Sequence, residues 1–599
     1  MTASAIALGV GLGVAYTLSP LTVVFALVVA GAGFLAVRDL PPRERRWVEA
    51  ALMVAVGARL LALALLLLAT DPVREPFLAW FPDARYVIAR SWRIRNLWFD
   101  VPIGPMYLFG LYDTYAASSF PYFLAVVQTV FGLAPYGVDL ISAAALIGGA
   151  LVLFRPARQA YGLAAAVPAL VAVLFWPTMF AWSLSALREA TQFFLVAVAL
   201  AGTVAAVRQR HWCRRALGAA GAAAATYGVA ALRAEALILL ALAIPFGLVL
   251  RLSTLRWWTS IAAVTVTLAV GLALGARPDV RAFVDHQTDL AANRHWGQVN
   301  TPGRSFKLLD ERIYKGGPEA TFTMTRGEAA RFFARSAAAF VLMPLPWQVG
   351  SLPELAIVPQ QLVWYATVML AIFGLRTAWR QDALLTALLA GYSVAGLIVI
   401  APNSGNIGTL VRHRDMVTPV VLWLAGVGLA ALVALARRTR SPTPSRAPRL
   451  SGDRRPMLGR LNPIDAFVAV AFALTVGVSA ASVRVFRMPP PAIDNVKPPA
   501  LEDVRHRLRL EGHDFRQYLR VFLSPTGRPL VLSDPIHHNS EALFVMHTRA
   551  EAELEVPAGT APGIYDLYVY DEGREVARRP AAFSVAVPAG PARRAGMSE

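Results

Sequence analysis

Long runs of apolar residues recur along the first 482 positions of the chain. A helix needs about 20 apolar residues to cross the hydrocarbon core of a bilayer. Runs of about this length occupy residues 46–69, 136–154, 162–182, 187–206, 216–232, 235–250, 257–275, 357–375, 383–401, 415–436 and 464–482. Residues 1–37 add one or two more, with a break at Ser19-Pro20. The pattern predicts a polytopic α-helical membrane protein with about 12 or 13 transmembrane helices.

Two further apolar segments, residues 119–134 and 336–350, contain proline in positions that interrupt a helix. The first reads Phe120-Pro121-Tyr122, and the second has Pro344 and Pro346 two residues apart. Proline removes a backbone donor and kinks helices. We therefore expect interfacial or re-entrant segments here, which survive at membrane depth only against protein or water.

Short loops rich in arginine predict the orientation, because such loops stay on the cytoplasmic side. They lie at 38–46, 155–158, 208–215, 251–256 and 376–380, and the tract 437–460 contains eight arginines. If all of these loops lie on the cytoplasmic side, three polar stretches lie on the extracytoplasmic side: 70–118, 276–335 and 402–414. We call these the three outer loops.

The pattern changes after Arg484. Residues 484–500 are rich in proline and read as a linker. Residues 501–585 alternate apolar and polar positions in short runs, such as 521–523, 529–532, 542–546 and 564–570, separated by Gly and Pro turns. This predicts a small C-terminal all-β sandwich and a disordered tail over 586–599. The number of predicted membrane crossings places the sandwich on the extracytoplasmic side.

The expected organisation follows from these segments. It comprises N-terminal spans and a basic loop (1–45), a transmembrane core (46–436), an Arg/Pro-rich cytoplasmic linker (437–463), a last transmembrane helix (464–483), the Pro-rich linker (484–500), the sandwich (501–585) and the tail (586–599).

Composition narrows the class of protein. The 599 residues are 56% hydrophobic and 16% charged, whereas soluble domains are about 45–50% apolar and about 25% charged. A soluble enzyme and a disordered chain are therefore excluded. The single cysteine, Cys213, excludes an internal disulfide framework.

The net charge is +19, and almost all of the positively charged residues are arginines. A GC-rich genome would favour arginine codons. A functional explanation is an anionic partner, either membrane lipid or a lipid-linked phosphate. Nucleic acid is the weakest of the candidate partners for a membrane protein, and we expect none.

The first outer loop combines carboxylates, arginines and aromatic residues. Its part from Phe81 to Tyr115 contains several Tyr and Trp, three aspartates and four arginines. The charged residues of interest there are Asp83, Asp100, Asp113, Arg85, Arg90, Arg93 and Arg95. A carboxylate beside arginines suits base catalysis on a hydroxyl next to an anionic donor. The alternative is an ordinary interfacial loop, where aromatics sit at headgroup level and arginines meet lipid phosphate.

The order of features over residues 46–250 resembles a known family. A span is followed by an outer loop with Asp83-Ala84-Arg85-Tyr86, and then by Phe120-Pro121-Tyr122 and Phe131-Gly132. A basic patch and Tyr161-Gly162 come next, then Phe175-Trp176-Pro177 and Leu187-Arg188-Glu189-Ala190. This layout resembles the glycosyltransferase C superfamily of polytopic enzymes, in particular its protein O-mannosyltransferase and aminoarabinose-transferase branch.

The resemblance implies a polyprenyl-phosphate-linked sugar donor, an outward-facing active site and a loop aspartate as general base. Asp83 is the matching position, with Arg85 and Tyr86 beside it as substrate contacts. The chain departs from the family at two places. Asp83 is flanked by Pro82 and Ala84 where two adjacent acids are common, and Phe120-Pro121-Tyr122 stands where His-Pro-Pro is common. Because of both departures, the resemblance does not settle which residue is the base or what the acceptor is.

Charged residues at span ends are the next candidates, because a leaving lipid phosphate needs cations. Arg188 with Glu189, and Arg233, are expected to contact phosphate or substrate. The alternative is an internal Arg–Glu pair that braces helices. Arg412 and Arg414 follow a Gly-rich turn in the third outer loop and are expected to contact phosphate or glycan, unless they form an ordinary membrane-flanking basic cluster.

The second outer loop, 276–335, contains His286 and His295 near aspartates, but the spacing matches no metal-ligand motif. We expect no metal and no cofactor, and interpret the loop as a lid over the substrate or as a solvated connector.

The sequence thus predicts a glycosyltransferase of the bacterial inner (cytoplasmic) membrane with an extracytoplasmic C-terminal domain. It would transfer a sugar from a polyprenyl-phosphate-linked donor to a hydroxyl on a glycan, lipid or protein, in cell-envelope or exopolysaccharide assembly. Two alternatives remain: a polymerase or ligase acting on lipid-linked oligosaccharide, and a non-enzymatic transporter of lipid or glycan. A transporter usually shows paired half-repeats with broken helices, which the sequence does not.

Overall fold

The computed structural model describes most of the helical region and the C-terminal domain. The described residues are 19–70, 81–99, 119–132, 136–253, 257–299, 305–308, 324–348, 352–440, 490–501, 507–515, 519–530, 541–557, 559–571 and 574–586, together with three isolated glycines near the N-terminus. The predicted last span at 464–482, most of the linker 437–463 and all but the first residue of the tail 586–599 lie outside the described residues.

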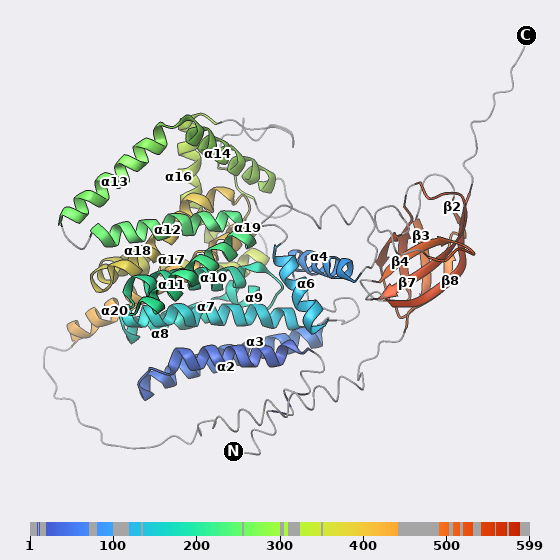
Figure 1. The fold of residues 1–599 in the computed structure, drawn as a ribbon, viewed down its shortest axis with the longest axis horizontal. Coiled ribbons are helices and arrows are strands. Elements are labelled where there is room, and N and C mark those ends of the chain that lie inside the picture. Colours follow the sequence, from blue (N-terminus) through green and yellow to red (C-terminus); the bar gives the residue numbers. More distant parts are fainter. Residues whose placement is uncertain are drawn as a thin grey trace, which may run out of the picture. The chain divides into compact units, whose positions relative to one another are not determined.

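Every apolar run predicted as a span within the described residues forms helix (Figure 1). The helices are α2 (Leu21–Val37), α3 (Pro42–Ala69), α7 (Gly137–Tyr161), α8 (Leu163–Phe175), α9 (Pro177–Trp182), α10 (Arg188–Arg208), α11 (Trp212–Leu232), α12 (Ala234–Ser253), α13 (Trp257–Ala276), α17 (Leu352–Gln381), α18 (Ala383–Val399) and α20 (Thr418–Arg440). The predicted run 162–182 is divided into α8 and α9 because Pro177 begins a new helix after Trp176.

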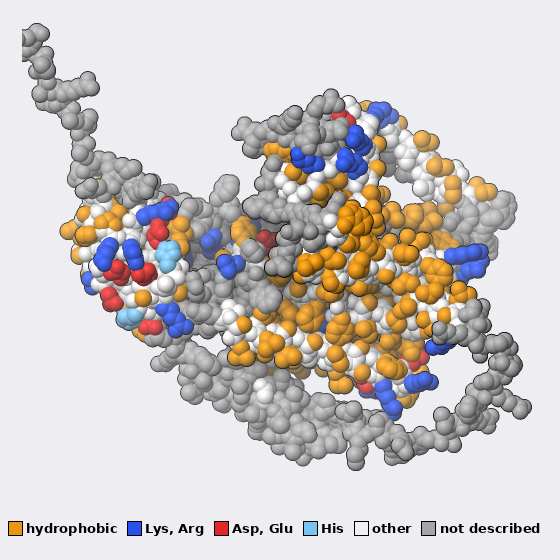
Figure 2. All heavy atoms as spheres, turned by 180° about the vertical axis from the view of Figure 1, so that it is seen from behind, with side chains coloured by type: hydrophobic (Ala, Val, Ile, Leu, Met, Phe, Trp, Pro, Cys, Tyr) orange, Lys and Arg blue, Asp and Glu red, His pale blue; other side chains and the backbone are white. Residues whose placement is uncertain are grey.

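Five of the described helices are long and apolar enough to cross a membrane, and six if a bent pair counts as one span. Five more apolar helices are shorter, at 10–17 residues. Large apolar side chains such as Leu61, Met369 and Ile372 are more than half exposed, and apolar side chains cover much of the helical surface (Figure 2). A large exposed apolar surface marks contact with a membrane or with another protein, and the candidate spans favour the membrane. The chain is therefore a multi-pass membrane protein.

The polar stretches predicted as outer loops contain helices within their described parts. These are α4 (Pro82–Trp98), α14 (Pro278–Val299) and α19 (Ile407–Arg414), and α16 (Arg326–Leu342) begins in the second loop and runs into the proline-broken segment. The other such segment forms α6 (Ser119–Phe131). The interpretation of 402–414 as a Gly-rich loop is corrected, because Asn406 caps α19 by accepting from the Thr409 amide at 2.7 Å.

The chain divides into two compact units. One comprises Met1–Phe25, Leu61–Ile141 and Leu458–Glu599, and the other comprises Ala26–Leu60 and Ser142–Met457. We call the latter the helical core unit, and describe each unit by itself.

In the helical core unit, α10 packs against α11, α12 against α18, and α20 against both α17 and α8. Small residues allow the closest of these approaches. A Cβ on Gly428 of α20 would lie 1.9 Å from the carbonyl oxygen of Leu370 on α17, and one on Gly374 would lie 2.5 Å from the Gly428 amide nitrogen. Glycine at both positions thus brings the two backbones into direct contact.

The C-terminal domain is all-β, as predicted, and its described strands form one eight-stranded sheet in the order β1-β3-β6-β5-β4-β7-β8-β2. The strands are β1 (Ala492–Lys497), β2 (Ala500–Leu501), β3 (Arg507–His513), β4 (Arg520–Pro525), β5 (Glu541–Met546), β6 (Glu551–Glu555), β7 (Gly563–Asp571) and β8 (Arg574–Val585). β4 pairs with β5 over two residue pairs only, and β1 packs against β8. The sheet therefore curls around its main apolar core, and Phe522, Tyr568 and Tyr570 form a second, smaller cluster.

The domain begins earlier than predicted, because β1 lies inside the segment 484–500 that we interpreted as a linker. A bulge between Ile493 and Asn495 puts Ile493 and Val496, three positions apart, into the same core. That spacing breaks the two-residue alternation of a regular strand, which hid the strand in the sequence. Pro529 and Leu530, predicted to begin a strand, lie outside the strands.

We expect Gly428→Val to destabilise the protein by about 1–3 kcal/mol, because the added side chain forces α17 and α20 apart. The measurement is the thermal unfolding midpoint in a neutral detergent. Gly57→Ala is the matched control, since nothing lies within 4 Å of a Cβ at Gly57. An unchanged midpoint for Gly428→Val would contradict the close packing.

Candidate functional site: a buried arginine–glutamate cluster

Three helix boundaries of the helical core unit supply the residues of this site. Arg188 and Glu189 occupy the first turn of α10, after the extended N-cap residue Leu187. Arg233 lies at the break between α11 and α12 in extended conformation. Arg412 belongs to the short helix α19. Because each residue sits where a helix begins or ends, polar side chains from distant segments meet in one place.

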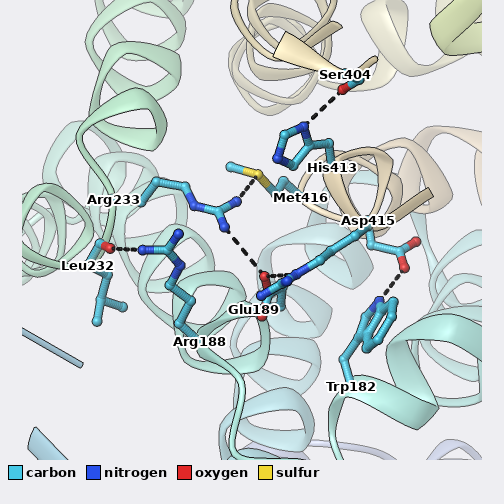
Figure 3. A network of polar contacts seen from close by, with 10 residues as sticks. Trp182, Arg188, Glu189, Leu232, Arg233, Ser404, His413, Asp415 and Met416 are labelled. Carbon is cyan, nitrogen blue, oxygen red and sulfur yellow. Dashed lines mark hydrogen bonds and ion pairs between the residues drawn. The ribbon is translucent and has the colours of Figure 1, made fainter. Parts of the chain in front are cut away.

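Glu189 is the centre of the cluster (Figure 3). Its Oε1 accepts a hydrogen bond from Arg412 Nε at 2.6 Å and a longer one from Arg233 Nη2 at 3.5 Å. Arg188 turns to the Leu232 carbonyl oxygen at 3.0 Å, which ends α11 just before Arg233. We call Arg188, Glu189, Arg233 and Arg412 the Glu189 cluster.

The cluster carries a surplus of positive charge in a buried setting. The side chains of Glu189 and Arg233 are 4% and 8% exposed, and that of Arg412 is 21% exposed. One carboxylate faces three guanidinium groups, so the four side chains sum to +2. Charge of this sign away from water attracts an anion strongly, because screening is weak there. Glu189 Oε2 has no hydrogen-bond partner among the described residues and can accept one from a ligand.

His413 adds no charge to the cluster at neutral pH. Its Nδ1 lies 2.9 Å from the hydroxyl oxygen of Ser404. Burial, reinforced by the nearby Arg233 and Arg412, lowers the pKa of His413 to about 3. The imidazole is thus neutral, and the arginines alone provide the positive field.

Asp415 fixes the other side of α19 to α9. Its Oδ2 accepts a hydrogen bond from Trp182 Nε1 at 2.7 Å, and its side chain lies beside the cluster (Figure 3). Burial raises the pKa of Asp415 to about 7, against the opposing hydrogen bonds and the charge of Arg414. α19 is therefore held to α10 through Glu189 and to α9 through Asp415.

Arg414 is placed apart from the Glu189 cluster. Its Nη1 donates to Gln361 Oε1 at 2.6 Å, its Nη2 donates to the Met343 carbonyl, and its guanidinium lies 5.1 Å from the Trp364 ring. Residues two apart on a helix face different directions, and the two guanidinium groups contact different partners. Arg414 holds the end of α16, and its role in binding phosphate or glycan stays a prediction.

Asp83, Arg85 and Tyr86 lie in α4, which belongs to the other unit and is described apart from the cluster. All three side chains are exposed. Asp83 stands in the first turn of the helix, where a carboxylate is also favourable for the helix dipole. Tyr86 contacts Arg90, whose Nη1 lies 3.4 Å from the phenol oxygen. The catalytic role of Asp83 stays a prediction.

His295, one of the two histidines of the second outer loop, is packed between aromatic rings. Phe306 and Phe332 lie 5.7 and 5.9 Å away, edge to face, and its Nδ1 lies 3.2 Å from the Ser404 carbonyl oxygen. The described residues contain no group of three or more metal-ligating side chains.

Sequence reasoning missed Arg59, which is fully buried in α3. Its Nε donates to Ser183 Oγ at 2.9 Å and its Nη2 to the Leu174 carbonyl at 2.8 Å. These bonds hold the end of α8 and the turn before α10, and thereby the start of α10. A lone arginine within an apolar run is the signal that could have found it.

We expect Glu189→Gln to lower the free energy of unfolding by about 3–5 kcal/mol, because it leaves buried guanidinium groups without an anion. Thermal unfolding in detergent measures the effect. Glu49→Gln is the control, since Glu49 pairs with Arg45 on the surface at 2.6 Å and such pairs contribute about 0–1 kcal/mol. Equal midpoints for the two variants would contradict a stabilising role for Glu189.

The raised pKa of Asp415 leads us to expect that stability depends on pH. The folded-state pKa, about 7, lies above the usual pKa of an aspartate, about 4. The folded state therefore keeps this proton to a higher pH than the unfolded state does. Stability should therefore fall as pH rises from about 4 to about 7, by at most about 1.4 kcal/mol per pH unit. Unfolding midpoints measured across this range should be flatter for Asp415→Asn. The same slope in both proteins would contradict the assignment.

Comparisons with known proteins give a limited result. No family model matches the sequence, and no curated protein matches it. Among solved structures, the chain is similar to ArnT from Cupriavidus metallidurans in the apo state, with 15% identity over 65% of this chain and 60% of that chain (TM-score 0.37). It is also similar to ArnT from the same organism bound to undecaprenyl phosphate, with 17% identity over 73% of this chain and 72% of that chain (TM-score 0.37). The chain thus spans less than two thirds of the apo structure's length.

Proposed function

We propose that this protein is a membrane glycosyltransferase that transfers a sugar from a polyprenyl-phosphate-linked donor to a hydroxyl acceptor on the extracytoplasmic side. The acceptor is a glycan, a lipid or a protein, and the process is assembly of the cell envelope or an exopolysaccharide. The observation that carries the proposal is the Glu189 cluster. The sequence singled out its four members, and the structure brings them together.

The cluster suits the phosphate of such a donor. Guanidinium groups bind phosphate oxygens through charge-assisted hydrogen bonds, and the charge surplus of +2 would neutralise the phosphate. Arg412 is more exposed than Glu189 or Arg233 and is proposed as the first to meet the ligand. Glu189 holds Arg412 and Arg233 in position, and its second oxygen can accept a hydrogen bond from a sugar hydroxyl.

The surrounding helices suit the lipid part of the donor. The apolar helices described above place the cluster within a membrane protein whose outer surface is covered by apolar side chains (Figure 2). A polyprenyl chain therefore stays in the hydrocarbon phase while its phosphate meets the arginines, at no cost of moving the chain into water.

The proposed reaction is a single displacement with inversion. The acceptor hydroxyl oxygen attacks the anomeric carbon, and the bond from that carbon to the phosphate oxygen breaks. The electron pair of that bond goes to the phosphate, where the three arginines stabilise the developing negative charge. Asp83 is proposed to take the acceptor's proton as general base.

We expect Arg412→Gln to weaken binding of undecaprenyl phosphate by about tenfold or more, because a hydrogen bond to a charged group contributes about 1.5–3 kcal/mol. Native mass spectrometry of the purified protein measures this. Arg437→Gln is the control, since Arg437 is exposed near the end of α20. Unchanged affinity for the Arg412 variant would overturn the phosphate role of the cluster.

The same preparation tests the chemistry. Release of a radiolabelled hexose from its polyprenyl phosphate is expected for the wild type and lost in Asp83→Asn, with Asp494→Asn of the β-domain as the active control. A folded, fully active Asp83 variant would remove Asp83 from the mechanism. Binding of the lipid without release of any sugar in the wild type, with acceptor extracts present, would favour a transporter.

A further inference from the structure

Arg59 of α3 is a buried charge that the proposed reaction does not use. Its side chain is 0% exposed. Its Nε donates to Ser183 Oγ at 2.9 Å, its Nη2 to the Leu174 carbonyl oxygen at 2.8 Å and its Nη1 to the Ala55 carbonyl oxygen at 3.1 Å. None of these partners is an anion, and Arg59 forms no ion pair within the part of the chain that the structure describes.

A buried guanidinium group without a carboxylate is costly, because burying a charge is unfavourable unless an opposite charge compensates it. Apolar packing between α3 and its neighbours would join these helices without that cost. An ionisable residue inside the membrane-spanning part of a protein is a candidate for a functional role. We therefore infer that Arg59 meets a requirement other than stability.

Arg59 holds the short helix α9 at both of its ends. Leu174 lies in the last turn of α8, just before α9, and Ser183 follows Trp182, the last residue of α9. Between these two contacts, the guanidinium carbon lies 4.7 Å from the centroid of the Phe180 ring. α9 has six residues, and isolated helices shorter than about 12 residues are marginal. The position of α9 therefore depends on such contacts with its neighbours.

α17 holds the first turn of α9. The Thr178 amide donates to Gln360 Oε1 at 3.1 Å, and Gln360 Nε2 donates to Thr178 Oγ1 at 2.8 Å. Ser183 lies five residues further along the chain, where Arg59 binds it. Arg59 therefore acts on the end of α9 that carries Trp182.

This end of α9 is connected to both partners of the 2.6 Å contact in the Glu189 cluster. Trp182 Nε1 donates to Asp415 Oδ2 at 2.7 Å (Figure 3), and Asp415 caps the C-terminus of α19, which carries Arg412. The turn 183–187 leads from α9 into α10, whose first turn contains Glu189. Arg412 Nε and Glu189 Oε1 meet at 2.6 Å. A shift of α9 therefore changes how these two side chains meet.

We propose that Arg59 is a positioning residue of the phosphate site. It fixes α9 and, through the contact between Trp182 and Asp415, the direction in which α19 presents Arg412 to the donor phosphate. Arg59 itself does not touch the ligand. The proposal rests on the proposed function, because Arg412 is the residue proposed to meet the phosphate first.

The test measures the affinity of the purified full-length chain for undecaprenyl phosphate by native mass spectrometry, together with the thermal unfolding midpoint of each variant. Arg59→Gln should weaken binding about tenfold, the equivalent of one lost hydrogen bond to a charged group. Arg59→Lys should weaken it as much, because a lysine keeps the charge but lacks the planar fork of donors. Arg45→Gln is the matched control on the same helix, since Arg45 pairs with Glu49 on the surface, and should bind as the wild type does.

A double-variant comparison separates positioning from a merely structural role. Trp182→Phe removes the donor to Asp415 and should itself weaken binding about tenfold. If Arg59 acts through this contact, Arg59→Gln/Trp182→Phe should bind within about twofold of Trp182→Phe alone. A loss of about 100-fold, the product of two independent effects, would overturn the proposed route.

The remaining outcomes are also decisive. Unchanged affinity in a folded Arg59→Gln protein overturns the proposal even if the unfolding midpoint falls, because that is the result expected of a structural brace. Full affinity in Arg59→Lys shows that charge alone is needed and overturns the positioning role.

Ser183→Ala keeps the test decisive if the Arg59 variants do not fold. It removes one acceptor of Arg59 at the end of α9 and should weaken binding about threefold, as expected for one neutral hydrogen bond; unchanged affinity overturns the proposal. If the wild type does not bind undecaprenyl phosphate, the proposed function fails and this proposal with it. If the wild type binds it and the Arg59 variants bind it equally well, this proposal alone fails.

Discussion

The arrangement of the helical core unit depends on the ion pairs that the buried carboxylate of Glu189 forms with arginines. It joins the start of α10 to Arg233 at the break between α11 and α12, and to Arg412 on α19. A charge buried to this degree is stable only when it is paired, so the three segments can occupy this arrangement only together. Burying Glu189 is costly unless positive charges surround it. The three guanidinium groups around this one carboxylate leave a net charge of +2, which an incoming anion can neutralise.

The same constraint accounts for the unusual backbone around the cluster. Arg59 donates hydrogen bonds to the Leu174 carbonyl in the last turn of α8 and to the Ser183 hydroxyl. Trp182 donates to the Asp415 carboxylate. Arg188 donates to the Leu232 carbonyl at the end of α11. Each of these side chains pairs with a group at a helix end, where backbone carbonyls lack partners within the helix. The polar side chains and the interrupted helices therefore stabilise one another. A continuous helix through 163–182 would have no open carbonyl for Arg59 to bind.

The sequence predicted the helices well and their ends less well. Hydropathy located the apolar runs because membrane helices need about 20 apolar residues, and helix is confirmed at each run that the described residues cover. It did not show α19, because Asn403 to Asn406 read as a turn and the eight-residue helix after it is too short for a periodic signal. It missed β1 because a bulge places Ile493 and Val496 on one face. Charged residues at span ends predicted four members of the cluster, but spacing alone could not separate Arg412 from Arg414. Only the direction of α19 decides which arginine meets Glu189.

α10 is held by ion pairs at both of its ends. At its start, the buried Glu189 accepts hydrogen bonds from Arg412 and Arg233. At its end, Arg208 pairs with Asp382, which also caps α18 by accepting from the Leu385 amide. The two ends lie about 30 Å apart along the helix. The position of Glu189 therefore depends on contacts at both ends of α10, and not on the cluster alone.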